Sequence, residues 1–171
     1  MKARIPFANR RAIDPRRSNI ALDANALNRH GTKHDALVDR LENLSEDGVL
    51  HVVLGGGVPD EVQHPNTSAR KRAAMLPKIF NLRPGLTSGQ RAERQRVAEI
   101  LRGNAQPGTH ANDASHLAEA AETGCSYFIT HDRRILRKRD ELRAVLPPNL
   151  WIVSLEEFFE IFDDFIAGRR M

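Results

Sequence analysis

The chain has 171 residues, with 26 Lys and Arg against 22 Asp and Glu, which give a formal net charge of +4 at pH 7. A chain of this length fits one compact domain that buries roughly two-thirds of the surface of its unfolded form. The single Cys125 excludes an internal disulfide and favours a reducing, cytoplasmic setting, and the histidines lack the paired spacing with cysteines that is typical of zinc sites. The apolar runs are too short to cross a bilayer, and the basic N-terminus lacks the apolar core of a signal peptide.

The excess positive charge is concentrated in three clusters. A polyanionic partner such as RNA would suit clusters that line up along a groove. Solvated helix faces explain each cluster equally well when it is taken alone. The clusters are Arg10, Arg11, Arg16 and Arg17; Arg70, Lys71 and Arg72; and Arg133, Arg134, Arg137, Lys138 and Arg139.

The first half of the chain predicts a basic, mobile tail over residues 1–18 and then the start of a single domain over residues 19–171. A short buried strand is expected at residues 19–22 (NIAL), followed by a helical pattern over 24–30 that Gly31 ends. An amphipathic helix over 34–44 and a second buried strand over 49–54 follow.

Three consecutive glycines, residues 55–57, come directly after the second predicted strand. A tight exit from the strand and a phosphate cradle both suit such a run, and the missing P-loop lysine favours the tight exit. Residues 65–108 are charged and predicted to be mostly helical, with Thr87 or Ser88 as an N-cap and Gly103 as a C-terminal stop.

The last third of the chain alternates between helices and strands. Helices are predicted over 113–123 and 133–145, and strands over 126–130 and 150–153. Ser154 and Glu157 form a capping box for a final helix whose phenylalanines are expected in the core, with a dimer surface as the alternative. This alternation predicts an α/β fold, a three-layer α/β/α sandwich with a central, mainly parallel sheet.

Three aspartates lie at positions that such a sheet would bring close together. Asp23 and Asp132 follow predicted strands, and Asp113 lies in the first turn of a predicted helix. Each of them could simply cap a helix, but ligands of open parallel sheets bind at the carboxyl ends of the strands. Gathered carboxylates repel one another unless a hard divalent ion such as Mg²⁺ or Mn²⁺ is bound.

A fourth acid is expected after the second strand, within the sequence VPDEVQ. Glu61 is preferred for its reach, and Asp60 is the second choice. Either acid could instead favour the positive end of a helix dipole.

The segments LDANAL, NDASHLAEAAETG and YFITHD, with an acid after the second strand, resemble the PIN-domain ribonucleases, including the VapC-like toxins of toxin–antitoxin pairs. The resemblance covers residues 19–159. It implies a PIN-like fold, RNA as the substrate and a cognate antitoxin as a partner. It also implies that Asp23, Glu61, Asp113 and Asp132 are the catalytic acids that bind Mg²⁺ or Mn²⁺, and that Asn25 and Thr130 support them.

Other polar residues lie close to the acids in the sequence. His110, His116 and His131 invite a general-base role, but structural or solvent-facing roles are favoured because metal activation needs no histidine base. Arg133 and Arg134 are the candidates for RNA phosphate contacts.

The expected function is therefore that of a metal-dependent endoribonuclease, the toxin of a toxin–antitoxin pair, with a homodimer as one assembly state. The alternative is a catalytically silent PIN-like module that binds RNA or protein. A Mg²⁺-dependent phosphohydrolase or receiver-like domain is disfavoured, because LDANAL has no second aspartate two positions after Asp23.

Overall fold

A computed structural model describes residues 12–53 and 87–169 of the chain. Its centre is a four-stranded sheet in which all neighbouring strands are parallel, in the order β2-β1-β3-β4. The strands are β1 (Asn19–Leu22), β2 (His51–Val53), β3 (Tyr127–Ile129) and β4 (Trp151–Val153). Each of them lies within a strand predicted from the sequence, and the parallel arrangement is confirmed.

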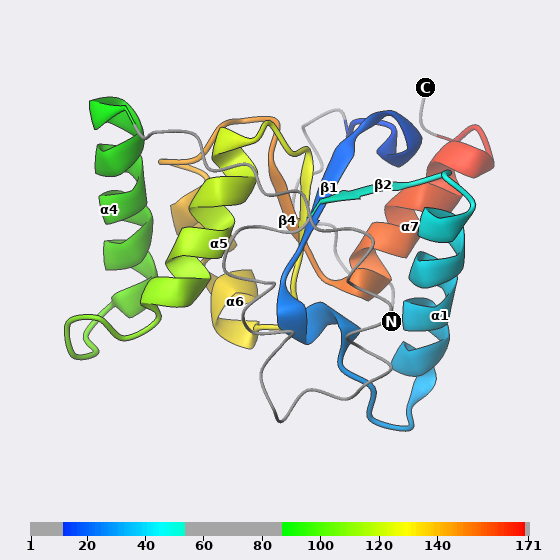
Figure 1. Cartoon of the computed structure of the whole chain (residues 1–171), viewed down its shortest axis with the longest axis horizontal. Helices are drawn as coiled ribbons and strands as arrows, with labels where there is room; N and C mark the ends of the chain where they lie inside the picture. The colour runs from blue at the N-terminus through cyan, green and yellow to red at the C-terminus, as the bar shows by residue number, and fades with distance from the viewer. Residues whose placement is uncertain (1–11, 54–86, 170–171) are drawn as a thin grey trace.

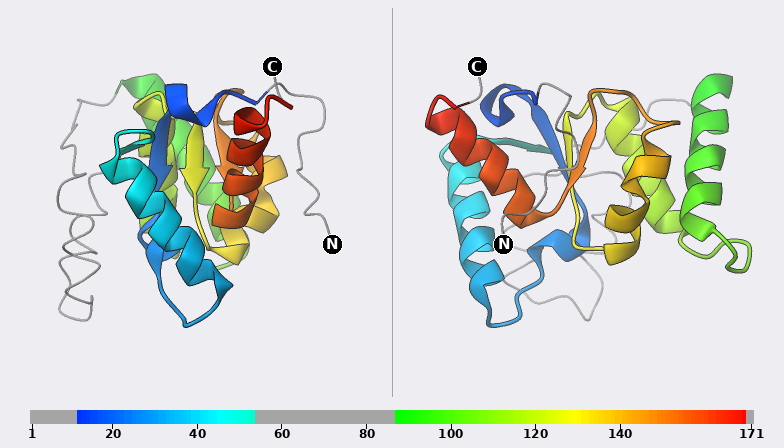
Figure 2. Two further views of the ribbon diagram at one scale, coloured as in Figure 1. Left: turned by 90° about the vertical axis from the view of Figure 1, so that its right-hand side faces the viewer. Right: turned by 180° about the vertical axis from the view of Figure 1, so that it is seen from behind.

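Helices lie on both sides of this sheet (Figures 1 and 2). One side carries α1 (Lys33–Glu46) and α7 (Leu155–Ile166), and the other carries α5 (Ala111–Glu122) and α6 (Arg133–Leu142) with α4 (Ser88–Arg102) packed against both. The arrangement is compatible with the expected three-layer sandwich. Within the described residues, none of the helices has the length and apolar character that crossing a bilayer requires.

Strand alternation divides the hydrophobic core between the two faces of the sheet. In β3, Tyr127 and Ile129 join the core formed with α1 and α7, whereas Phe128 joins the core formed with α4, α5 and α6. Phe158, Phe159 and Phe162 of α7 are buried in the first of these cores, as predicted, and Phe165 packs against it partly buried. This alternation also decides which way the side chains beyond the strand ends face.

Several helix boundaries follow the sequence signals closely. Thr87 and Gln90 form a capping box at the start of α4, and Ser154 and Glu157 form another at the start of α7. Gly103 ends α4 as predicted. These local motifs explain why the helix ends were readable from the sequence.

Three predicted elements differ from the structure. The pattern over 24–30 forms only a 3₁₀ turn, η2 (Ala24–Leu27), and the helix predicted over 133–145 ends at Leu142. Residues Val49 and Leu50 precede β2, because their amides bond to the carbonyl of Leu44 and complete the end of α1. The glycine run and the predicted strand residue Leu54 lie outside the described residues.

The N-terminal segment from residue 12 onward is part of the packed domain, which corrects the predicted boundary of the tail at residue 18. Ala12, Pro15 and Ser18 are buried, and the hydroxyl of Tyr127 donates a hydrogen bond to the carbonyl of Ile13. Asp14 caps the short 3₁₀ helix η1 (Pro15–Arg17), with proline at its first position. The Asp-Pro pair is a sequence signal for the start of a helix, and it lies within the segment that was predicted to be a tail from its basic composition.

Candidate functional site

The predicted acids were expected at the carboxyl ends of β1 and β3. These two strands are neighbours in the sheet, but the chain leaves β1 toward α1 on one face and leaves β3 toward α6 on the other. Diverging connections of this kind leave an open crevice between the strand ends, where ligands of parallel sheets bind.

Asp23 lies at the end of β1 and is almost completely buried. It occupies the N-cap position of η2, but its side chain makes no capping hydrogen bond. Its Oδ2 accepts a hydrogen bond of 2.8 Å from the hydroxyl of Thr130, and its Oδ1 lies 3.9 Å from Nδ1 of His116 on α5. Capping therefore does not explain this buried carboxylate.

Thr130 and Asn25 tie the two strand ends together. The Thr130 hydroxyl donates to Asp23 and accepts a hydrogen bond of 3.0 Å from the amide of Asp132. The Asn25 side-chain carbonyl accepts a hydrogen bond of 2.9 Å from the amide of His131. These contacts link the end of β1, which precedes Asp23, to the end of β3, which precedes Asp132.

Asp132 acts as the N-cap of α6, the alternative that the sequence left open. Its Oδ1 accepts hydrogen bonds from the amides of Arg134, at 2.7 Å, and Ile135, at 3.4 Å. Within residues 12–53 and 87–169 its second oxygen, Oδ2, accepts none. Capping orients this carboxylate and still leaves one oxygen for a ligand.

Asp113 lies in the first turn of α5 rather than at its cap, which is His110. Burial raises the pKa of Asp113, the negative charge of Asp23 raises it further, and Asp132 adds to the effect. A hydrogen bond from His110, with Nδ1 at 3.3 Å from Oδ2, opposes this rise in the pKa. The three acids are therefore close enough to repel one another.

His110 holds an unusual backbone conformation. Its φ of 63° is left-handed, and no other non-glycine residue in the described part of the chain has a positive φ. Such conformations are uncommon outside glycine and often occur at functional sites. At this position it brings the imidazole of His110 onto Asp113.

The other two histidines near the acids lie on different faces of the sheet. His116 is buried on α5 and faces Asp23. His131 turns the other way and stacks on His34 of α1, with ring centroids 4.1 Å apart. Burial lowers the pKa of His131, the neighbouring His34 lowers it further, and Glu156 opposes the change. Their sequence positions alone did not indicate these contacts.

Arg133 and Arg134 follow Asp132 at the start of α6. Arg133 is exposed and Arg134 is half-buried, and neither guanidinium forms an ion pair with another described residue. Two basic residues of the same cluster are engaged inside the fold, because Arg139 binds Glu157 at 2.8 Å and Lys138 donates to the carbonyl of Ile100 at 2.6 Å. Arg139 and Lys138 are therefore weaker candidates for phosphate contacts than Arg133 and Arg134.

The donor set of the crevice fits a hard divalent cation. Oxygen ligands from carboxylates are those that Mg²⁺ and Mn²⁺ prefer. A bound cation would also relieve the repulsion that raises the pKa of Asp113. The predicted fourth acid, Glu61 or its alternative Asp60, lies outside the described residues.

We expect Thr130→Val to destabilise the protein more than Thr130→Ser. The valine removes all hydrogen bonds of the hydroxyl and leaves the buried Oδ2 of Asp23 without its donor, which costs about 1.5–3 kcal/mol. The serine keeps the hydroxyl and loses one methyl group, which costs about 1 kcal/mol. Urea denaturation measures both changes, and an equal or larger loss in the serine variant would show that packing, not hydrogen bonding, dominates.

The sequence motifs that suggested a ribonuclease family lie around this crevice, except for the part outside the described residues. In the structure the charges of Asp23 and Asp132 both act on Asp113, and Asn25 and Thr130 lie between the strand ends. Comparisons with protein-family models, with characterised proteins and with solved structures gave no match for this chain.

Proposed function

We propose that the protein is a metal-dependent endoribonuclease of the PIN-domain type. The observation that carries this proposal is the convergence of Asp23, Asp113 and Asp132 at the crevice between β1 and β3, where burial and the charges of Asp23 and Asp132 raise the pKa of Asp113. The order of the motifs along the chain, which resembles that of the PIN-domain ribonucleases, also supports the proposal. Glu61 completes the proposed ligand set, with Mg²⁺ or Mn²⁺ as the ion.

Each residue of the crevice has a distinct part in the proposed reaction. Asp23, Asp113 and Asp132 supply oxygen ligands, and Thr130 and Asn25 hold the strand ends at a fixed spacing. When bound, a divalent ion lowers the pKa of a coordinated water and polarises a phosphate oxygen, which together favour cleavage of a phosphodiester bond. His110 and His116 contact Asp113 and Asp23, so we assign them to positioning the acids.

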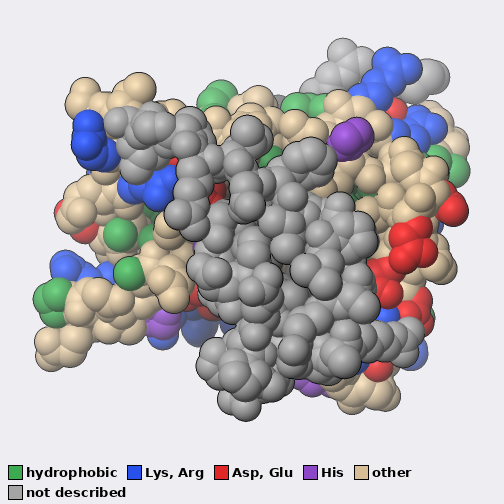
Figure 3. All heavy atoms as spheres, viewed as in Figure 1, with side chains coloured by type: hydrophobic (Ala, Val, Ile, Leu, Met, Phe, Trp, Pro, Cys, Tyr) green, Lys and Arg blue, Asp and Glu red, His purple; other side chains and the backbone are tan. Residues whose placement is uncertain are grey.

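Charge on the surface supports an approach of RNA from the side of α6. Acidic side chains gather over α1, along the right-hand edge of the molecule in Figure 3, and α1 carries Asp35, Asp39, Glu42 and Glu46. An RNA phosphate backbone would be repelled there. Arg133 and Arg134, next to Asp132, are free of ion pairs to described residues and would attract it.

The biological setting that we propose follows from the resemblance. A nuclease of the VapC-like kind would act in the cytoplasm as a toxin, with a cognate antitoxin protein as its partner. A homodimer is the assembly state that we propose for it.

The metal dependence of RNA cleavage tests the proposal. We expect the purified chain to cut single-stranded RNA in the presence of Mn²⁺ or Mg²⁺ and to stop when a chelator is added. Cutting that continues at the same rate with chelator would contradict the proposal.

The alternative function is that of a catalytically silent module. The observation in its support is that carboxylate oxygens of two acids already accept hydrogen bonds within the protein, because Asp132 caps α6 and Asp23 accepts from Thr130. Calorimetric titration separates the two functions. RNA binding without any Mn²⁺ binding at millimolar concentration would identify the silent module. Binding of Mn²⁺ by the wild type, together with cleavage, would identify the nuclease.

A further inference from the structure

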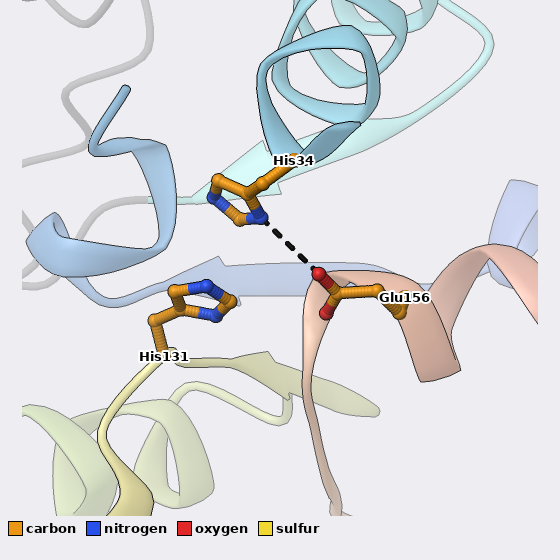
Figure 4. Close-up of side chains that lie close together, drawn as sticks. All are labelled: His34, His131 and Glu156. Atoms are coloured by element: carbon orange, nitrogen blue, oxygen red, sulfur yellow. Dashed lines mark hydrogen bonds and ion pairs between the residues drawn. The ribbon is translucent and has the colours of Figure 1, made fainter. Parts of the chain in front are cut away.

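A second group of potential metal ligands lies on the opposite face of the same sheet edge. His34 on α1, His131 after β3 and Glu156 in the first turn of α7 each offer one ligand atom, and these atoms all lie within 4.8 Å of one another. Figure 4 shows the three side chains converging from three separate elements. The group contains two imidazoles and one carboxylate, so its chemistry differs from that of the all-carboxylate crevice.

The hydrogen bond of His34 fixes which of its nitrogens faces the group. Its Nε2 lies 3.1 Å from the backbone carbonyl of Ala26. A carbonyl oxygen only accepts hydrogen bonds, so Nε2 must carry a proton and donate. In the neutral ring the lone pair is then on Nδ1, which points toward Glu156. Backbone carbonyls orient metal-binding histidines in this way in many proteins.

The distance between Nδ1 of His34 and Oε1 of Glu156 is 3.4 Å. A charge-assisted hydrogen bond between an imidazolium and a carboxylate is shorter, about 2.7–2.9 Å. Two ligands on a tetrahedral ion, each about 2.0–2.1 Å from it, are separated by about 3.3–3.5 Å. The observed separation lies in the range of two neighbouring ligands on one ion and is longer than that of a tight ion pair.

The position of His131 is fixed by the backbone rather than by its ring. Its amide donates to Asn25, and the ring stacks on His34 with an interplanar angle of 25°. The ring is only half-buried, so it can tilt to bring a nitrogen toward the other two ligands. Coordination by all three residues requires this adjustment.

The alternation of β3 keeps this group apart from the acidic crevice. Thr130 lies on the same face of the sheet as Phe128 and donates a hydrogen bond to Asp23. His131 lies on the face of Tyr127 and Ile129, where it contacts α1. Neighbouring residues in the chain thus contribute to opposite faces.

We propose that His34, His131 and Glu156 bind a divalent transition-metal ion of the Zn²⁺ class, with water completing its coordination. Two imidazole nitrogens and one carboxylate oxygen form a donor set that Zn²⁺ accepts with an open position. The bound ion joins α1, the end of β3 and the start of α7, which are distant in the sequence. This inference does not depend on the proposed ribonuclease function.

The structural alternative is an ion pair between His34 and Glu156 without any metal. It predicts that the folded protein has no preference for Zn²⁺ and that neutralising Glu156 does not alter metal affinity. A measurement of Zn²⁺ binding therefore distinguishes the metal site from the ion pair.

Isothermal titration of the full, chelator-treated chain with Zn²⁺ tests the proposal. We expect one ion per chain at this site, with affinity at least about tenfold weaker in Glu156→Gln and in His131→Ala. The matched controls Glu160→Gln, on the exposed face of α7, and His51→Ala, at an exposed position of β2, should leave the affinity unchanged. These variants avoid the buried His34, whose loss could unfold the protein.

Two further readouts make the outcome decisive. Co²⁺ in place of Zn²⁺ should give the visible absorption of a four-coordinate ion, and Glu156→Gln should weaken it. Asp113→Asn should keep the Zn²⁺ affinity, because its carboxylate belongs to the other face. Absence of Zn²⁺ binding at submillimolar concentration, or binding that is lost in Asp113→Asn but kept in Glu156→Gln, would overturn the proposal.

Discussion

Replacing Asp113 by asparagine should abolish RNA cleavage while making the metal-free protein more stable. Loss of one proposed ligand should reduce metal-dependent cleavage at least about 100-fold, since even residues behind a ligand change affinity or activity by 10–100-fold. The gain in stability follows from the raised pKa of Asp113, because burial and the charges of Asp23 and Asp132 disfavour its carboxylate. Calorimetry in chelator should show a melting temperature higher by about 1–4 °C, corresponding to roughly 0.5–1 kcal/mol.

The pH dependence of this gain has a definite sign. A folded-state pKa above the unfolded value means that the contribution of Asp113 to stability is fully present below the unfolded pKa. That contribution is lost as the pH rises through the folded pKa. The advantage of Asp113→Asn over the wild type should therefore be present at neutral pH and shrink in acid.

Asp140→Asn is the matched control for this substitution. Asp140 is an exposed aspartate on α6, with 77% of its side chain accessible, and it lies outside the crevice. It should change neither cleavage nor the melting temperature by a measurable amount. Wild-type cleavage by Asp113→Asn, or a lower melting temperature at neutral pH, would refute the assigned role of Asp113.

The second large effect is expected from Phe158→Ala in the core beneath α7. Phe158 is fully buried and contacts the rings of Tyr127, Phe159 and Phe162, with centroid separations of 5.4, 5.5 and 6.5 Å. Truncating a buried phenylalanine to alanine costs about 3–5 kcal/mol through lost burial and the cavity left behind. In a protein of this size the melting temperature should fall by about 6–20 °C, at roughly 2–4 °C per kcal/mol.

Ile166→Ala provides the comparison within the same helix. Ile166 is 56% exposed, so its truncation should change the free energy of unfolding by no more than about 0.5 kcal/mol. Denaturation of the two variants side by side measures the difference. A loss below about 1 kcal/mol in Phe158→Ala would mean that the core tolerates the cavity by collapsing around it.

The sequence predicted the parts of the fold that depend on local patterns. The short apolar strands, the N-cap at Thr87, the capping box at Ser154 and the stop at Gly103 all appear where they were expected. These signals depend on residues a few positions apart, which is why they could be read without a structure. The tail boundary was wrong because the segment packs on the domain through contacts distant in the sequence, such as the hydrogen bond from Tyr127 of β3 to the carbonyl of Ile13.

Only the part of the candidate site that depends on the sheet topology could be predicted from the sequence. Asp23 and Asp132 follow strands, so a parallel sheet brings them to one edge. Contacts that span the chain left no local signal: His34 and Glu156 are 122 positions apart, and their meeting depends on how α1 and α7 pack. The absence of paired histidine and cysteine spacing excluded a zinc finger pattern but not a site assembled by the tertiary fold.

The location of Mn²⁺ in crystals, determined by its anomalous scattering, tests the central claim most directly. The proposed nuclease predicts a peak in the crevice between β1 and β3, within coordination distance of carboxylate oxygens of Asp23, Asp113 and Asp132. The peak should disappear in Asp113→Asn. A peak found only at His34, His131 and Glu156, or none at either site in the presence of millimolar Mn²⁺, would contradict the claim that the acids form the catalytic metal site.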